Sequence, residues 1–151
     1  MLSGIIAAAS ALLGVALSTI LAHRQARAVR TEARTEQARQ DVLAAATALA
    51  AALTDHRRAM WVREDARLAG AEPDAFAKLR ADSHATRSAI TAPLTAIQIL
   101  APALASAADR AAAATYALRD TGTRTELDRA REAAITALAA LTAAVRAEIG
   151  R

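Results

Sequence analysis

The sequence predicts an all-α protein, in which an N-terminal single transmembrane helix continues into an antiparallel cytoplasmic helical bundle of about four helices. Three observations support this fold class. The first 22 residues carry no charged side chain. The rest of the chain is rich in alanine, the best helix former, and only 2% of all residues are aromatic. Its apolar residues recur every three or four positions, as on one face of a helix. We divide the chain into a transmembrane anchor (1–22), a basic juxtamembrane helix (23–41) and a cytoplasmic helical bundle (42–151).

The anchor is the apolar run MLSGIIAAASALLGVALSTILA, residues 1–22. At about 1.5 Å per residue, about 18 apolar residues cross a bilayer core of roughly 30 Å. Arginines follow this run instead of preceding it, which favours an N-terminus outside and a C-terminal domain in the cytoplasm. A cleaved signal peptide, which carries its positive charge first, is one alternative. A very alanine-rich soluble helix is the other.

Small residues share one face of the anchor. Ser10, Gly14 and Ser18 recur every four residues, a spacing that lets two membrane helices approach closely and pack. This face is a candidate surface for self-association in the membrane; the alternative is that such spacings arise by chance in an alanine-rich helix.

The juxtamembrane helix is basic, with five arginines and two glutamates between residues 23 and 40. At about 100° per residue, its first arginines fall on one stripe of the helix. We expect Arg24, Arg27 and Arg30 to contact anionic lipid headgroups at the membrane surface, each contributing up to about 1 kcal/mol. The alternative is a solvated face that only sets the topology.

The first two bundle helices are separated by a turn. One helix should run from residue 42 to about residue 69, with Gly70 as the residue that ends it. Pro73 suits the first turn of the next helix. That helix keeps one apolar stripe across Pro93, so we expect it to be kinked there but unbroken. The inward positions are expected to be Val42, Ala46, Leu49, Leu53, His56, Met60, Phe76, Leu79, Ser83, Thr86, Ile90, Leu94, Ile97 and Leu100.

Two further helices complete the bundle. A proline begins a shorter helix over 102–118, and a turn follows at 120–122. Thr123 and Glu126 match a capping box that starts a last helix at 124–149. Because the connections are short, we expect an up-and-down bundle, or long hairpins that complete their core with a second copy. The inward positions are expected to be Leu104, Ala108, Ala111, Thr115, Leu118, Leu127, Ala134, Leu138, Leu141, Val145 and Ile149.

The sequence offers no motif for catalysis, cofactors or metals. It has no glycine-rich phosphate loop, no His-Glu-x-x-His pair, no calcium loop and no cysteine. We therefore expect no enzyme activity, no cofactor and no metal site. His56 lies on an apolar stripe and should be a structural histidine; a polar pocket around it and Asp55 would instead favour a ligand sensor or enzyme. The charged side chains near it are expected on a solvated helix face, namely Asp55, Arg58, Glu64, Asp65 and Arg67.

Trp61 is the only tryptophan of the chain. It is a candidate anchor for a protein partner, because tryptophan is enriched in binding hot spots; the alternative is that it covers the edge of the bundle. The net charge of +4 invites comparison with nucleic-acid-binding proteins. However, charges outside the juxtamembrane helix nearly balance and few aromatic rings are present, so direct nucleic-acid binding is not expected.

The order of these segments resembles a known family. An MLSGIIAAASALLGVALSTI span is followed by the arginine-rich HRQARAVRTEARTEQARQ, then LAAALTDHRRAMW, and a tail that ends in TELDRAREAAITALAALTAAVRAEI. This pattern is similar to the small actinobacterial membrane proteins called KilB, which are encoded on Streptomyces conjugative plasmids and integrated elements. The resemblance covers most of the chain and brings no catalytic residues. It implies an accessory role in plasmid transfer or spread.

The expected function is therefore that of a non-enzymatic single-pass protein of the bacterial plasma membrane. Its partners would be the lipid bilayer, further copies of the same chain and an unidentified protein recruited by the bundle. One alternative is a membrane-anchored structural stalk or scaffold, similar in layout to the peripheral stalk b subunit of rotary ATP synthases. The expected breaks at Gly70, Pro102 and Gly122 argue against an unbroken stalk. A small helical ligand sensor or DNA-binding accessory is the other alternative.

Overall fold

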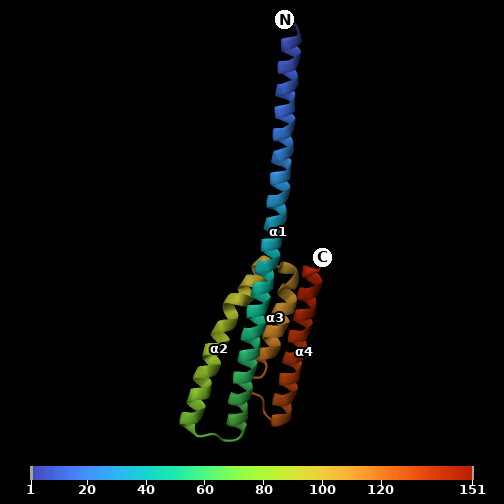
Figure 1. Cartoon of the computed structure of the whole chain (residues 1–151). Helices are drawn as coiled ribbons and strands as arrows, with labels where there is room; N and C mark the ends of the chain where they lie inside the picture. The colour runs from blue at the N-terminus through green and yellow to red at the C-terminus, as the bar shows by residue number, and fades with distance from the viewer. Residues whose placement is uncertain (1, 151) are drawn as a thin grey trace. The chain divides into compact units, whose positions relative to one another are not determined.

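The computed structural model describes the helical backbone of residues 2–150, and the side chains of Gln25, Arg27 and residues 29–150. No strand occurs in the backbone that it describes, so the all-α prediction is confirmed. The chain divides within its first helix into two compact units, each of which is described by itself. The helices are α1 (Leu2–Leu68), α2 (Pro73–Leu100), α3 (Pro102–Tyr116) and α4 (Arg124–Ile149) (Figure 1).

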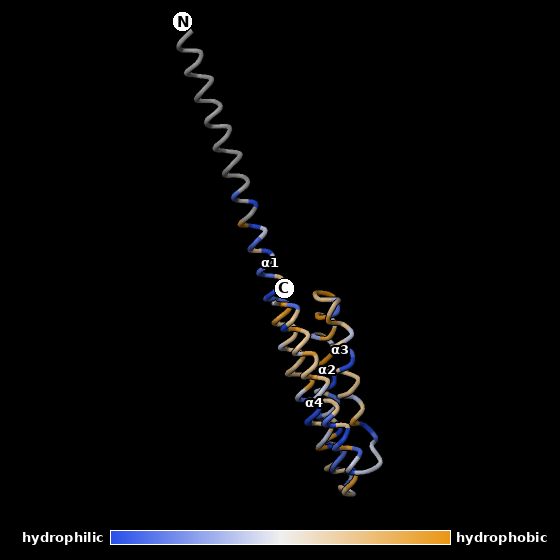
Figure 2. Tube along the Cα trace, turned by 90° about the vertical axis from the view of Figure 1, so that its right-hand side faces the viewer, coloured by the Kyte–Doolittle hydropathy of each residue, from blue (hydrophilic) through white to orange (hydrophobic). Residues whose placement is uncertain are grey.

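The N-terminal unit, Met1–Ala38, is the first part of α1. All of its described side chains are exposed, including those of Arg27 and Arg30. Figure 2 colours this described stretch as mainly hydrophilic. Thr31 donates a hydrogen bond to the Arg27 carbonyl at 2.9 Å, one turn earlier, so its hydroxyl is satisfied by the helix itself.

Three predictions fall on side chains outside the described residues. These are the transmembrane anchor at 1–22, the lipid contact of Arg24, and the small face of Ser10, Gly14 and Ser18. Among the residues that the structure describes, no helix combines the length and the apolar character that crossing a membrane requires. The anchor therefore stays a prediction.

The second unit, Arg39–Arg151, is an antiparallel helical bundle. Figure 1 shows the α1–α2 and α3–α4 connections at one end, which we call the double-loop end. Ala101, which links α2 to α3, lies at the opposite end with the C-terminal turn of α4; we call this the Ala101 end. α3 packs against both α2 and α4. The expected up-and-down bundle is confirmed.

The C-terminus of α1 is set by a glycine. Gly70 has φ +74°, a left-handed conformation that side chains disfavour. Its N–H donates to the Arg67 carbonyl at 3.2 Å, and the Ala71 N–H donates to the Ala66 carbonyl at 2.9 Å. This pair of bonds is the Schellman arrangement, which satisfies carbonyls that the helix leaves without partners. The predicted helix end is therefore confirmed.

The other helix boundaries also follow local chemistry. Pro73 and Pro102 occupy the first turns of α2 and α3, where a missing N–H costs nothing. α2 continues through Pro93 without a break. Thr123 caps α4: its hydroxyl accepts from the Glu126 N–H at 3.2 Å, while the Glu126 carboxylate accepts from the Thr123 N–H at 3.1 Å. The predicted capping box is confirmed.

Two clusters of buried apolar side chains form the core. The larger lies toward the Ala101 end and is mostly alanine, and the smaller lies toward the double-loop end. All the predicted inward positions are buried or half-buried except Leu100, which is 47% exposed. The prediction for Leu100 is wrong because α2 ends there and the neighbouring Ala101 takes the buried place. The smaller cluster consists of Met60, Leu118, Leu127 and Ala134.

Candidate functional site: two clefts between α1 and α4

A cleft of about 310 Å³ opens between α1 and α4 in the half of the bundle nearer the double-loop end. We call it the arginine cleft. Four of its lining residues come from α1 at steps of three, one and three, so they share one helix face. The fifth comes from α4. The lining residues are Thr54, Arg57, Arg58, Trp61 and Arg131.

Trp61 forms one wall of the arginine cleft. Its indole N–H donates to Asp128 Oδ1 at 3.3 Å, which ties α1 to α4. The guanidinium carbons of Arg124 and Arg131 lie 4.7 and 5.8 Å from the ring centroid, within cation–π range. The half-buried ring also packs against the smaller core cluster. Trp61 thus covers the edge of the bundle, and its role as a partner anchor stays a prediction.

The charges around the arginine cleft are unequally paired. Arg124 forms ion pairs with Asp65 and, at 3.6 Å, with Asp128. Arg57, Arg58 and Arg131 form no ion pair with a carboxylate in the part of the chain that the structure describes. Three of the residues that line the cleft are therefore arginines for which the described side chains supply no carboxylate partner.

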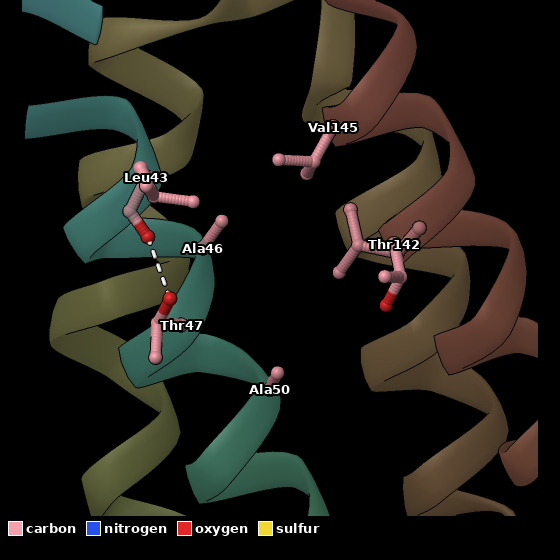
Figure 3. A pocket seen from close by; sticks show the side chains of 7 residues that line it. Leu43, Ala46, Thr47, Ala50, Thr142 and Val145 are labelled. Carbon is pink, nitrogen blue, oxygen red and sulfur yellow. Dashed lines mark hydrogen bonds between the residues drawn. The ribbon is translucent and has the colours of Figure 1, made fainter. Parts of the chain in front are cut away.

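A second cleft, of about 120 Å³, lies between the same helices toward the Ala101 end. We call it the apolar cleft. In Figure 3, Ala46 and Ala50 of α1 lie across from Thr142 and Val145 of α4. The Thr47 hydroxyl donates to the Leu43 carbonyl of its own helix at 2.8 Å, so it offers little polarity to the cleft. The small alanine side chains leave this space open.

Buried charges lie beside the smaller core cluster. Glu64 has no solvent exposure, and its Oε2 accepts from Arg67 Nε at 2.6 Å. Arg63 Nε lies 3.5 Å from the other oxygen of Glu64, and Arg63 Nη1 donates to Ser83 Oγ at 3.3 Å. Arg67 also donates to the Thr121 carbonyl in the α3–α4 loop.

The prediction that Glu64 lies on a solvated face is therefore wrong. The α3–α4 loop and α2 cover this face of α1, and the two arginines compensate the carboxylate. Asp55 and Arg58 are exposed, as predicted. Helix periodicity could not reveal the difference, because covering depends on where a distant loop folds.

His56 is buried at the centre of the bundle, with 2% exposure. Its Nδ1 shares a hydrogen bond of 2.9 Å with Thr86 Oγ1 of α2, and its ring meets the Tyr116 ring edge-on at 5.7 Å. Burial, helped by the positive charges of Arg87 and Arg63, lowers the pKa of His56 from 6.5 to about 4. The imidazole is therefore neutral at pH 7, and the predicted inward position of His56 is confirmed.

The space beside His56 is small. A polar cavity of about 20 Å³ lies against it and against His84 and Arg87, while Asp55 is not among its lining residues. This volume holds about one water molecule. No group of three His, Asp or Glu side chains within the described residues is arranged to hold a metal ion. The cavity therefore offers no room for a substrate.

Sequence reasoning placed Trp61 at a site but missed the arginines around it. Arg57 and Arg58 precede Trp61 by four and three residues, so a shared helix face was a usable signal. Arg131 lies 70 positions further along, and only the antiparallel packing of α4 on α1 brings it to the same cleft. Two of the three arginines predicted to contact lipid, Arg27 and Arg30, have described side chains, and both are exposed as lipid contact would require.

These features define an α-helical bundle protein with a long first helix and a cationic cleft. The chain belongs to the KilB plasmid transfer protein family, which matches residues 43–149. It is 51% identical to Protein KilB of Streptomyces lividans over 150 residues, an alignment that covers 99% of each chain. No solved structure matches the chain. The resemblance noted in the sequence is confirmed, and the family match coincides with the bundle.

Proposed function

We propose that this chain is a non-enzymatic single-pass membrane protein whose bundle faces the cytoplasm and assists plasmid spread. The observation that carries the proposal is the order of its parts. An uncharged run at 1–22 precedes a basic stretch, and the segment matched by the plasmid transfer family follows. An anchor of this kind would hold the bundle at the membrane, where plasmid DNA must cross between compartments.

The bundle is suited to a binding role. Its core holds a neutral histidine and compensated charges, whereas the unpaired arginines lie in an open cleft on its surface. Large apolar side chains are also exposed, namely those of Leu43, Ile99 and Leu100, and the last two directly precede Ala101 in the chain. Exposed apolar groups favour association with another protein surface. They support self-association of the bundle and recruitment of a partner.

The alternatives have less support. A continuous stalk would not reverse direction at Gly70, Ala101 and Gly122 within the bundle. A ligand sensor would need more space than the cavity of about 20 Å³ beside His56.

The topology can be tested with single cysteines, because the natural chain has none. Ser3→Cys places a thiol at the outer end of the predicted anchor, and Ala85→Cys places one at an exposed position of α2. In intact spheroplasts, a membrane-impermeant maleimide should label Ser3→Cys but not Ala85→Cys. After lysis, both should react. Labelling of Ala85→Cys before lysis would contradict a cytoplasmic bundle.

A further inference from the structure

The arginine cleft concentrates positive charge that the chain does not neutralise. Arg57 and Arg58 come from α1 and Arg131 comes from α4, so arginine residues line the cleft on both helices. The neighbouring Arg124 is different, because Asp65 and Asp128 pair with it. Like charges held together repel, and an anion bound between them relieves that repulsion. The cleft is therefore complementary to a negatively charged group.

The side chains also fit a particular kind of anion. A guanidinium group is a planar fork that binds a carboxylate through two parallel hydrogen bonds. The Arg131 guanidinium carbon lies 5.8 Å from the centroid of the Trp61 ring, and this cation–π contact already restrains the arginine side chain before a ligand binds. Tryptophan and arginine are also the residues that most often dominate the affinity of protein interfaces. Their meeting in one cleft indicates a surface for a protein segment.

We propose that the arginine cleft binds an acidic peptide segment of a partner protein. Carboxylates of the segment pair with Arg57, Arg58 and Arg131, and its backbone or aliphatic parts pack against Trp61. The inference rests on the proposed function, in which the bundle recruits a partner, and it names the chemistry of that partner. In this proposal Trp61 packs against the bound segment, and the three arginines make binding specific for negatively charged segments.

The surroundings of the cleft favour a peptide over a nucleic acid. A nucleic-acid backbone needs a track of cations that follows many phosphates. Here Asp65 and Asp128 lie at the double-loop side of the cationic surface, where they pair with Arg124. The Trp61 ring, which would have to stack on a base, is already contacted by two guanidinium groups and bonded to Asp128. The surface therefore suits a short acidic segment.

The test uses the full chain in detergent and a fluorescein-labelled peptide of consecutive glutamates. Fluorescence anisotropy measures binding of this peptide, and a peptide of consecutive glutamines is the uncharged control. The cleft variant combines Arg57→Gln, Arg58→Gln and Arg131→Gln. A charge-matched variant combines Arg80→Gln, Arg110→Gln and Arg146→Gln, which are exposed positions outside the cleft.

The cleft variant should lose at least about tenfold in affinity for the glutamate peptide, and the charge-matched variant should lose less than about twofold. Replacing the three cleft arginines by lysine keeps the charge but removes the planar forks, so its loss should be intermediate. Circular dichroism checks that each variant is as helical as the natural chain. Equal losses in the two glutamine variants would overturn the proposal, because they would indicate net charge alone.

A duplex DNA fragment provides the competing outcome. If DNA binds more tightly than the glutamate peptide, and if the cleft variant removes that binding, the cleft is a nucleic-acid site and the proposal is wrong. The labelling of Ser3→Cys and Ala85→Cys does not depend on the cleft. A failed peptide experiment with the expected labelling would therefore reject the cleft inference alone, whereas unexpected labelling would reject the membrane topology.

Discussion

The two ends of the bundle are built from different chemistry. Toward the Ala101 end, the core cluster combines eight alanines with seven larger aliphatic side chains, such as Leu49 and Ile97. Toward the double-loop end, the apolar cluster is small, and beside it lie the buried charges of Arg63 and Glu64. One end is held by aliphatic burial, and the other adds hydrogen-bonded ions.

The two ends therefore contribute differently. The aliphatic core contributes stability, whereas the buried charges determine how the helices and the α3–α4 loop are arranged. Alanine packs closely but buries little area, and adjacent alanine faces can slide past one another with little change in energy. A buried carboxylate tolerates only the arrangement that brings its arginines to it. The contact of Arg67 with Glu64 and with the Thr121 carbonyl therefore fixes how the α3–α4 loop lies on α1. We infer that the double-loop end sets the register of a core that alanine alone would leave loosely defined.

The largest expected effect is at Glu64. Replacing Glu64 by Ala leaves Arg63 buried without its counter-charge, which should lower the free energy of unfolding by about 4 kcal/mol. Trp61 is the only tryptophan and lies in the bundle, so its fluorescence reports bundle unfolding in denaturant. A loss below about 1 kcal/mol would show that the buried pair does not hold this end.

A double replacement sharpens the same comparison. If the Glu64→Ala variant loses stability because Arg63 is left as an uncompensated charge, replacing Arg63 by Met and Glu64 by Leu together should recover most of the lost free energy of unfolding. If the double variant is as unstable as Glu64→Ala, the hydrogen bonds of Arg63 and Arg67 to neighbouring elements matter more than the buried charge.

The next effect is a dependence on pH that comes from the centre of the bundle. The pKa of His56 is lowered to about 4 in the folded chain, whereas it is near 6.5 when unfolded. As the pH falls, His56 therefore becomes protonated in the unfolded chain at a higher pH than in the folded chain. The contribution of His56 is fully present above the unfolded pKa and is lost as pH falls from there toward about 4. Between about pH 7 and about pH 5, the loss should be about 2 kcal/mol.

Two variants isolate this titration. His56→Gln cannot charge in this range, so its stability should fall less than that of the natural chain over the same interval. His84→Gln, the same replacement at an exposed histidine, is the matched control. Equal pH slopes for the natural chain and His56→Gln, measured by denaturant unfolding, would mean that other groups carry the dependence.

The smallest effect concerns the apolar cleft. Ala50→Leu puts apolar volume into a space that alanine leaves open, and it should raise the free energy of unfolding by about 1 kcal/mol. Ala48→Leu makes the same change at an exposed position of α1 and should shift stability by less than about 0.5 kcal/mol. A destabilised Ala50→Leu variant would show that the two helices approach more closely than the cleft allows.

Helix boundaries could be predicted because their causes are local. Gly70, Pro102 and the Thr123–Glu126 capping box each act within a few residues of the end that they define. The inward positions followed from periodicity for the same reason. Leu100 was the exception, because it is the last residue of α2 and the neighbouring Ala101 is buried in its place.

The candidate site was less predictable because it is assembled from distant residues. Trp61 stood out by its rarity, but Arg131 joins it only through the packing of α4 against α1. Glu64 looked like any charged residue on a helix until α2 and the α3–α4 loop covered it. Spacing within one helix shows which residues share a face, and tertiary packing decides whether that face is covered.

The most direct measurement for the proposed function is membrane fractionation of the full chain. Alkaline carbonate should leave the natural protein in the membrane pellet. A variant with Leu13→Arg and Leu17→Arg should be released, because each charge at the centre of a span costs about 3 kcal/mol of insertion. Val29→Arg adds a charge at an exposed position outside the predicted anchor and should remain in the pellet. Release of the natural chain into the carbonate supernatant would contradict the proposal that residues 1–22 anchor the protein in the membrane.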